Sequence, residues 1–92
     1  MKDDNIMHVE REALAHILGL RKEAGLTEKE LGEKAFPDTK NPRQKISAFY
    51  NVKGKEGTPL RIRLGDFCAM CQAMGKHPAQ ELLTVWAKIN PE

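Results

Sequence analysis

Cysteine, aromatic residues and long apolar runs are scarce or absent in this sequence of 92 residues. Two cysteines are too few for the disulfide framework that holds a small secreted protein together. A transmembrane helix needs about 20 mostly apolar residues in a row, and no such run occurs. The opening MKDDN has neither the basic cluster nor the apolar block of a signal peptide. We therefore expect one cytoplasmic domain over residues 1–92, with a modest and mostly aliphatic core.

Sequence motifs for catalysis and for metal binding are also missing. Gly54 and Gly57 lack the spacing of a phosphate-binding loop. Cys68 and Cys71 share one side of an expected helix, but structural zinc needs four ligands and the histidines are scattered. We expect both cysteines to be buried core residues. The chain is thus predicted not to be an enzyme, with no catalytic residue, metal or cofactor.

Charge is unevenly distributed along the chain. Residues 40–63 hold seven basic residues and one acidic residue, a local charge of +6, and we call this segment the basic strip. The other residues hold eight basic and twelve acidic ones, a charge of −4, so the total is +2. A positive strip on a mildly acidic body is typical of a polyanion-binding surface, although most charge runs are only solvated faces.

Apolar spacing and turn residues predict five helices, over about residues 6–24, 28–35, 42–52, 65–74 and 78–89. Gly25 is expected to end the first helix in a left-handed conformation, and Gly75 to close the fourth. Thr27 and Glu30 form a capping box at the start of the second. Asn41 is expected to cap the third helix, with Gln44 as its capping-box partner.

The segment between the third and fourth helices has a different pattern. Gly54 and Gly57 favour a turn. From Leu60 to Leu64, apolar and basic residues alternate, which is typical of a short strand. Residues 53–63 are therefore expected to form a loop, an extended connector or a short β-hairpin.

The third predicted helix separates apolar from polar residues. With Ile46 at 0° and about 100° per residue, Phe49 falls near 300° and Tyr50 near 40°. These three side chains predict the buried side of the helix. The opposite side and its flanks hold small or polar residues: Gln44, Lys45, Ser47, Ala48 and Asn51.

Three segments resemble the lambda-repressor and Cro-like helix-turn-helix family. They are GLTEKELGEKA at residues 25–35, Ile46-Ser47, and AMGKHP at residues 73–78 followed by Leu82. The first resembles that family's second helix, the dipeptide its recognition helix, and the last the junction between its final two helices. The match covers about residues 10–83 and implies an all-α, five-helix lambda-repressor-like DNA-binding domain, with an inserted loop or hairpin between helices three and four.

The sequence departs from the family pattern at two points. Glu28 stands where the family often has a glutamine that touches a DNA phosphate. The turn after the second helix is also longer, and Phe36 stands near the place of a common glycine. Both departures favour an alternative function, a protein-protein interaction module that keeps the helix-turn-helix fold without binding DNA.

The resemblance implies sequence-specific binding to double-stranded DNA by a small transcriptional regulator, such as a phage or bacterial repressor or an autoregulating antitoxin. The third helix then enters the major groove, where side-chain amides can read adenine and a methyl group can contact thymine. Base readout is expected from Gln44, Lys45, Ser47, Ala48 and Asn51. Phosphate contacts are expected from Lys40, Arg43, Lys53, Lys55, Arg61 and Arg63.

Two assignments stay open at this stage. Arg61 and Arg63 either contact DNA as a wing or pair with the protein's own acidic groups. The apolar stripe of the fifth helix either closes the core or leaves Leu83 and Trp86 as a dimer contact. The expected partners are therefore double-stranded DNA, with a homodimer and a partner toxin or other regulator protein as further alternatives, and no membrane.

Overall fold

The computed structural model describes residues 3–51 and 60–90, and these are entirely helical or irregular. The five helices are α1 (Asp3–Ala24), α2 (Glu28–Ala35), α3 (Pro42–Tyr50), α4 (Leu64–Ala73) and α5 (Pro78–Ile89). The expected all-α class is confirmed. Residues 60–63 form no strand, so the described part of the connector shows no hairpin. Gly54 and Gly57 lie outside the described residues.

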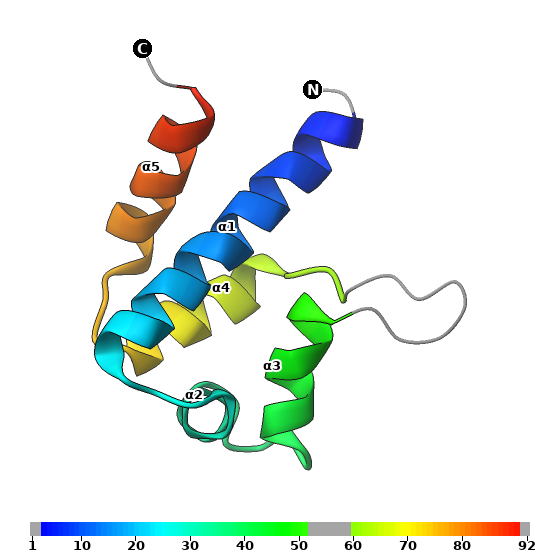
Figure 1. The fold of residues 1–92 in the computed structure, drawn as a ribbon, viewed down its shortest axis with the longest axis vertical. Helices are drawn as coiled ribbons and strands as arrows, with labels where there is room; N and C mark the ends of the chain where they lie inside the picture. The colour runs from blue at the N-terminus through cyan, green and yellow to red at the C-terminus, as the bar shows by residue number, and fades with distance from the viewer. Residues whose placement is uncertain (1–2, 52–59, 91–92) are drawn as a thin grey trace.

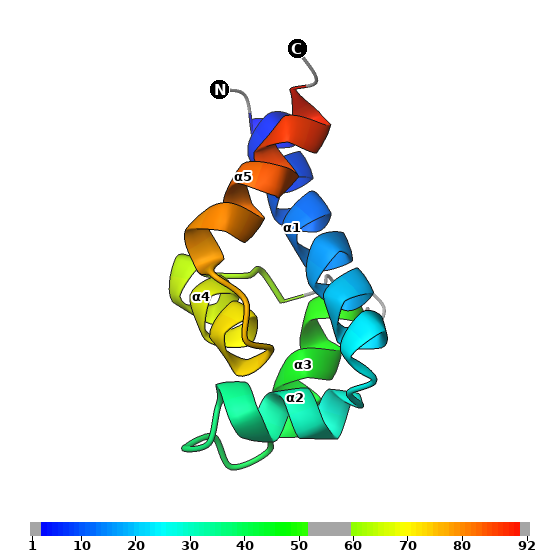
Figure 2. The same ribbon diagram turned by 90° about the vertical axis from the view of Figure 1, so that its left-hand side faces the viewer.

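The helices divide the molecule into two ends (Figures 1 and 2). At one end α2 lies across α3 and also contacts α4. At the other end α1 and α5 run side by side, and both chain termini lie there. α4 occupies the middle and contacts α1, α2 and α5. Among the described helices, none has the length and apolar character required to cross a membrane.

The core receives a fully buried apolar side chain from every helix. These side chains are Ile17, Leu31, Ile46, Met70 and Val85, all with no exposed surface. The apolar side chains of α1 are buried in its middle, whereas Ile6 and Ala24 near its two ends are exposed. The first turns of α1 lie at the end of the molecule away from α2 (Figure 1), and Ile6 is 38% exposed.

Local signals determine where α1 ends and α2 begins. Gly25 has φ 71°, and its N–H donates to the Lys22 carbonyl at 3.1 Å while Leu26 N–H donates to the Arg21 carbonyl at 3.1 Å. This pair of bonds is a Schellman motif, which requires the left-handed conformation that glycine adopts at little cost. The same arrangement occurs after α4 at Gly75, also with φ 71°. Both predicted helix stops are confirmed.

The capping box of α2 is also confirmed. Glu30 N–H donates to Thr27 Oγ1 at 3.1 Å, and Thr27 N–H donates to Glu30 Oε1 at 3.0 Å. The hydrogen bond from the Thr27 backbone lowers the pKa of Glu30 below its usual value. This helix has the bounds expected from the sequence.

The start of α3 differs from the prediction. Asn41 occupies the cap position and Pro42 the first helical position, but the Asn41 side chain makes no capping hydrogen bond. Its backbone has ψ 77°, whereas the working cap Thr27 has the extended ψ 165° that aims a side chain back at the helix. The predicted capping box of Asn41 and Gln44 is therefore wrong.

The fourth helix begins at Leu64, slightly earlier than expected, and Asp66 in its first turn caps the preceding residue. The Arg63 N–H donates to the Asp66 carboxylate at 3.0 Å, which satisfies a donor just before the helix. Cys71 is fully buried on this helix, as predicted, whereas Cys68 is half-buried. Burial raises the pKa of the Cys71 thiol to about 11, so this group stays unreactive near neutral pH.

Candidate nucleic-acid interface

α3 is held firmly by one side. Ile46 and Phe49 are buried, as predicted, and the half-buried Tyr50 donates its hydroxyl hydrogen to the Leu14 carbonyl of α1 at 2.7 Å. Burial raises the pKa of Tyr50 well above the ordinary tyrosine value. These contacts fix both the depth and the rotation of α3 on the core.

Gly32 lets α2 approach the start of α3 closely. A Cβ atom placed at Gly32 would lie 2.6 Å from the Pro42 carbonyl oxygen and 2.7 Å from its carbon. Side-chain carbons essentially never come so close to backbone atoms. The two helices therefore meet backbone to backbone at a single residue, which sets their crossing point.

The other side of α3 faces solvent at its beginning and end. Arg43, Gln44 and Asn51 are exposed, whereas Ser47 and Ala48 are half-buried. No acidic residue lies on α3. The outward direction predicted for the two amide side chains is therefore the one observed.

The end of α3 differs from the helix expected to reach residue 52. The helix stops at Tyr50, and Asn51 is extended with φ −113° and ψ 133°. The Asn51 Nδ2 group donates to Ser47 Oγ at 2.6 Å, so these two predicted readout residues bond each other. The Leu60 N–H donates to the Ala48 carbonyl at 2.7 Å, which brings the chain after residue 59 back to this helix end.

Lys45 does not point freely into solvent. Its Nζ atom lies 3.5 Å from Asp66 Oδ1 of α4 and 4.6 Å from the centre of the Phe36 ring. The ion pair and the cation–π contact tie α3 to α4 and to the turn after α2. Lys45 therefore has a structural partner that its position in the sequence does not reveal.

The basic strip is divided between two parts of the molecule. Lys40 and Arg43 are exposed around the start of α3. Arg61 instead makes a two-pronged contact with Glu10 of α1, with Nε at 2.9 Å and Nη2 at 2.6 Å from its oxygens. This contact lowers the pKa of Glu10. Arg63 lies at the start of α4, beside α1 residues.

Lys53 and Lys55 lie outside the described residues, so only part of the strip has a known position. Two roles were left open for Arg61, a wing-like DNA contact and pairing with an acidic group of the protein. The ion pair with Glu10 corresponds to the second role. Arg63 has an exposed side chain and lines a hollow with apolar residues of α1 and α4.

One cation near α3 was not expected from the sequence. Lys29 of α2, together with Arg43 and Gln44, lines a hollow of about 250 Å³ between α2 and the start of α3. Glu33 lies in the same hollow, with its carboxylate 3.9 Å from Lys29 Nζ. Lys29 could have been proposed from its place on the outward side of α2, but only the crossing of the helices brings it beside Arg43.

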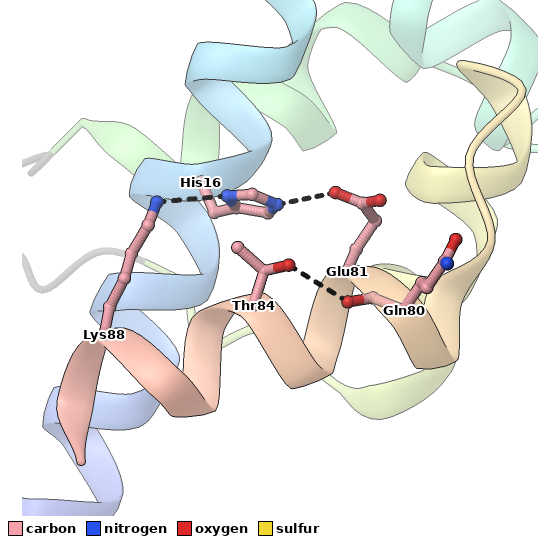
Figure 3. Close-up of polar contacts among 5 residues, drawn as sticks. All are labelled: His16, Gln80, Glu81, Thr84 and Lys88. Carbon is pink, nitrogen blue, oxygen red and sulfur yellow. Dashed lines mark hydrogen bonds and ion pairs between the residues drawn. The ribbon is translucent and has the colours of Figure 1, made fainter. Parts of the chain in front are cut away.

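The α1–α5 contact includes a polar bridge that the sequence analysis did not anticipate (Figure 3). His16 Nε2 lies 2.7 Å from Glu81 Oε1, and Lys88 Nζ lies 3.3 Å from His16 Nδ1. A tautomer with hydrogen on Nε2 donates to the carboxylate and accepts from the ammonium group. The bridge therefore joins one side of α5 to α1.

The apolar stripe of α5 is only partly buried. Val85 is fully buried and Ile89 is half-buried, as expected of a helix that closes the core. Leu83 and Trp86 are 67% and 45% exposed. The two residues considered for a dimer contact thus remain accessible, whereas the core uses the adjacent part of the helix.

The described residues show no metal site, and the comparisons with known proteins show no family. Within residues 3–51 and 60–90, no three His, Cys, Asp or Glu side chains are placed to hold a metal ion. In comparisons with known proteins, no family model, no curated protein and no solved structure matches this chain. Function must therefore be argued from the site itself.

Proposed function

We propose that this protein binds double-stranded DNA in a sequence-specific manner through α3, as a small transcriptional regulator of the lambda-repressor-like type. One observation carries the proposal. α3 is fixed to the core by Ile46 and Phe49, while Gln44 on its opposite side and Arg43 in its first turn are exposed and no carboxylate lies on the helix. A rigid helix with an exposed amide and nearby cations has the properties that major-groove readout requires.

Gln44 is the principal base-reading residue in this proposal. Its exposed amide can donate to and accept from one adenine edge, a pairing that contributes about 1–3 kcal/mol of discrimination. Asn51 has a smaller role, because its amide nitrogen already donates to Ser47. Its amide oxygen could accept one hydrogen bond from a base, and the half-buried Ala48 methyl group can contact thymine.

Phosphate binding is assigned to the cations around the start of α3. Lys40 and Arg43 are exposed there, and Lys29 borders the same hollow as Arg43. Each phosphate contact contributes about −0.9 to the slope of log K against log salt, so these three predict a slope of about −2.7. Lys53 and Lys55 remain predicted contacts and would steepen the slope.

A dimer would give this small domain a second half-site. Helix-turn-helix dimers bind half-sites about 34 Å apart, or one turn of DNA. Leu83 and Trp86 are exposed apolar side chains at the end of the molecule away from α2, and they are the residues we propose for this contact. Sedimentation of the wild type and of Leu83→Glu as a function of concentration tests it.

The alternative, an interaction module without DNA binding, is favoured by one specific feature. Lys45 is neutralised by Asp66, and Glu33 lies in the hollow beside Arg43. Both reduce the positive potential near α3. In this alternative, α3 would contact a protein surface rather than a DNA groove.

Selection of bound sites from random duplex oligonucleotides tests the proposal. The wild type should enrich a motif that contains adenine, and Gln44→Ala should lose the preference at one position while retaining overall binding. Gln72→Ala is the matched control, because Gln72 is exposed on α4. If no motif is enriched, or if both variants enrich the wild-type motif, Gln44 is not a base reader.

A further inference from the structure

A continuous apolar depression runs along α4, and we call it the α4–α5 groove. A hollow of about 530 Å³ lies between α4 and α5, and a second of about 210 Å³ continues toward α1. Leu64, Phe67 and Leu82 line both hollows, so the two form one groove. The larger hollow alone falls within the range of about 300–1,000 Å³ that ligand sites occupy.

The groove exposes apolar side chains that the core does not use. Leu64 is 70% exposed and Leu82 39% exposed, although both lie among other apolar groups. With Val85 turned to the core, Leu82, Trp86 and Leu83 lie at about 60°, 100° and 160° from it around α5. One side of α5 is held to α1 through His16, and the opposite side is left uncovered beside the groove. Clustered exposed apolar groups of this kind mark interaction sites.

Each end of the groove has a cationic side chain. Lys76 lines one end, and Arg63 lines the other. Among the described residues that line it, Glu10 is the only carboxylate, and Arg61 already binds both of its oxygens. An occupant with apolar groups along its middle and carboxylates at its sides or ends matches this pattern.

We propose that the α4–α5 groove binds an acidic amphipathic helix of a partner protein. Helices form both long walls, and no strand edge occurs in the described ranges to pair with an extended peptide. The suitable recognition mode is therefore a helix laid in a groove, with apolar anchors at i, i+3, i+4 and i+7. This inference does not depend on DNA binding, because α3 contributes no residue to the groove.

Cys68 provides a native reporter of occupancy. It lines the larger hollow and is half-buried, whereas Cys71 is fully buried with a raised pKa. Iodoacetamide should therefore alkylate Cys68 in the folded protein and leave Cys71 unmodified. Mass spectrometry of the intact chain and its peptides separates the two sites, and alkylation of Cys71 reports unfolding.

The probe is a designed peptide with leucines at i, i+3, i+4 and i+7 and glutamates at its flanks. A counterpart with lysine in place of each glutamate keeps the apolar pattern, and a permuted peptide keeps only the composition. At about ten times its Kd, the acidic peptide should slow Cys68 alkylation about tenfold. Equal protection by the lysine peptide, or no protection by the acidic one, overturns the proposal.

Substitutions in the protein test the same site independently of changes in the peptide. Leu64→Glu should abolish protection, and it leaves folding intact because Leu64 is mostly exposed at the start of α4. Leu60→Glu is the matched control and should retain protection, since Leu60 is exposed and lies outside the groove lining. Lys76→Glu should weaken the acidic peptide and favour the lysine peptide. If both leucine variants behave alike, the groove is not the binding site.

A second copy of the chain is the competing occupant. In that case Cys68 alkylation without peptide should slow as the protein concentration rises, and the acidic peptide should compete only with dimerisation. This result overturns the partner-helix proposal in favour of self-association. A rate that is independent of protein concentration supports a different protein as the natural occupant.

Discussion

The two ends of this molecule are built in opposite ways. At the α2–α3 end, the helices approach closely at Gly32, Leu31, Ile46 and Phe49 are buried, and polar and charged groups of both signs face outward. At the α1–α5 end, the His16 bridge holds one side of α5, while Leu83 and Trp86 remain exposed. The first end is the one that we propose for DNA, and the second is the one where apolar side chains stay exposed. One small fold thus offers two chemically distinct surfaces.

The largest expected difference between the ends concerns burial. Ile46→Ala removes a fully buried side chain of α3 and should lower the free energy of unfolding by about 2–5 kcal/mol. Leu83→Ala at the other end should change it by less than about 0.5 kcal/mol. Urea unfolding followed by circular dichroism measures both. A similar loss in the two variants would mean that Leu83 is buried in solution, for instance within a dimer.

Alanine substitutions at Gly32 and Gly19 test the close approach of α2 and α3. Gly32→Ala forces a Cβ against the Pro42 backbone and should destabilise the protein by about 1–3 kcal/mol. Gly19→Ala in α1 meets nothing within 4 Å and should stabilise it by about 0.5–1 kcal/mol. Opposite signs in thermal unfolding support a backbone contact between α2 and α3. A stabilising Gly32→Ala would show that the two helices have room between them.

The two helix caps at the α2–α3 end should also differ. Thr27→Ala removes a working side-chain cap and should cost about 1 kcal/mol. Asn41→Ala should cost clearly less, because Asn41 makes no capping hydrogen bond. Chemical denaturation of the two variants side by side is the measurement, and equal losses would indicate that Asn41 caps α3 after all.

The smallest expected loss of stability comes from removing the Tyr50 hydroxyl, which bonds α3 to α1. Tyr50→Phe should lower stability at pH 7 by about 0.5–1.5 kcal/mol. Because the pKa of Tyr50 is raised in the folded state, its contribution is complete below the ordinary value of about 10 and falls as the pH rises above it.

This alkaline loss should be smaller in Tyr50→Phe than in the wild type. Cys71 also has a raised pKa, so its ionisation adds to the loss of stability at alkaline pH. This contribution is the same in both proteins and cancels when their pH profiles are compared. Identical alkaline profiles for the two proteins would contradict the burial of this hydroxyl.

The sequence predicted those features that depend on near neighbours in the chain. The bounds of α2 and α5, the stops at Gly25 and Gly75, and the Thr27 cap all follow from residues within a few positions of each other. The inward side of α3 was also predictable, because helical periodicity alone separates Ile46 and Phe49 from Gln44.

The remaining features depend on residues far apart in the chain. Lys45 pairs with Asp66, Arg61 with Glu10, and His16 with Glu81, and periodicity does not identify such partners. The basic strip therefore reads as one surface in the sequence, although its described part is divided in space. The Asn41 cap fails because of its backbone conformation, with ψ 77°, and the residue types alone do not determine that angle.

The central claim is that the outward side of α3 binds DNA, and a titration of a labelled mixed-sequence duplex at two salt concentrations tests it most directly. The account predicts binding that weakens at higher salt, is lost in Arg43→Glu and is retained in Arg11→Glu. Arg11 is exposed on α1, so both variants change the net charge equally and differ only in place. No binding at low salt, or equal loss in both variants, would contradict the claim.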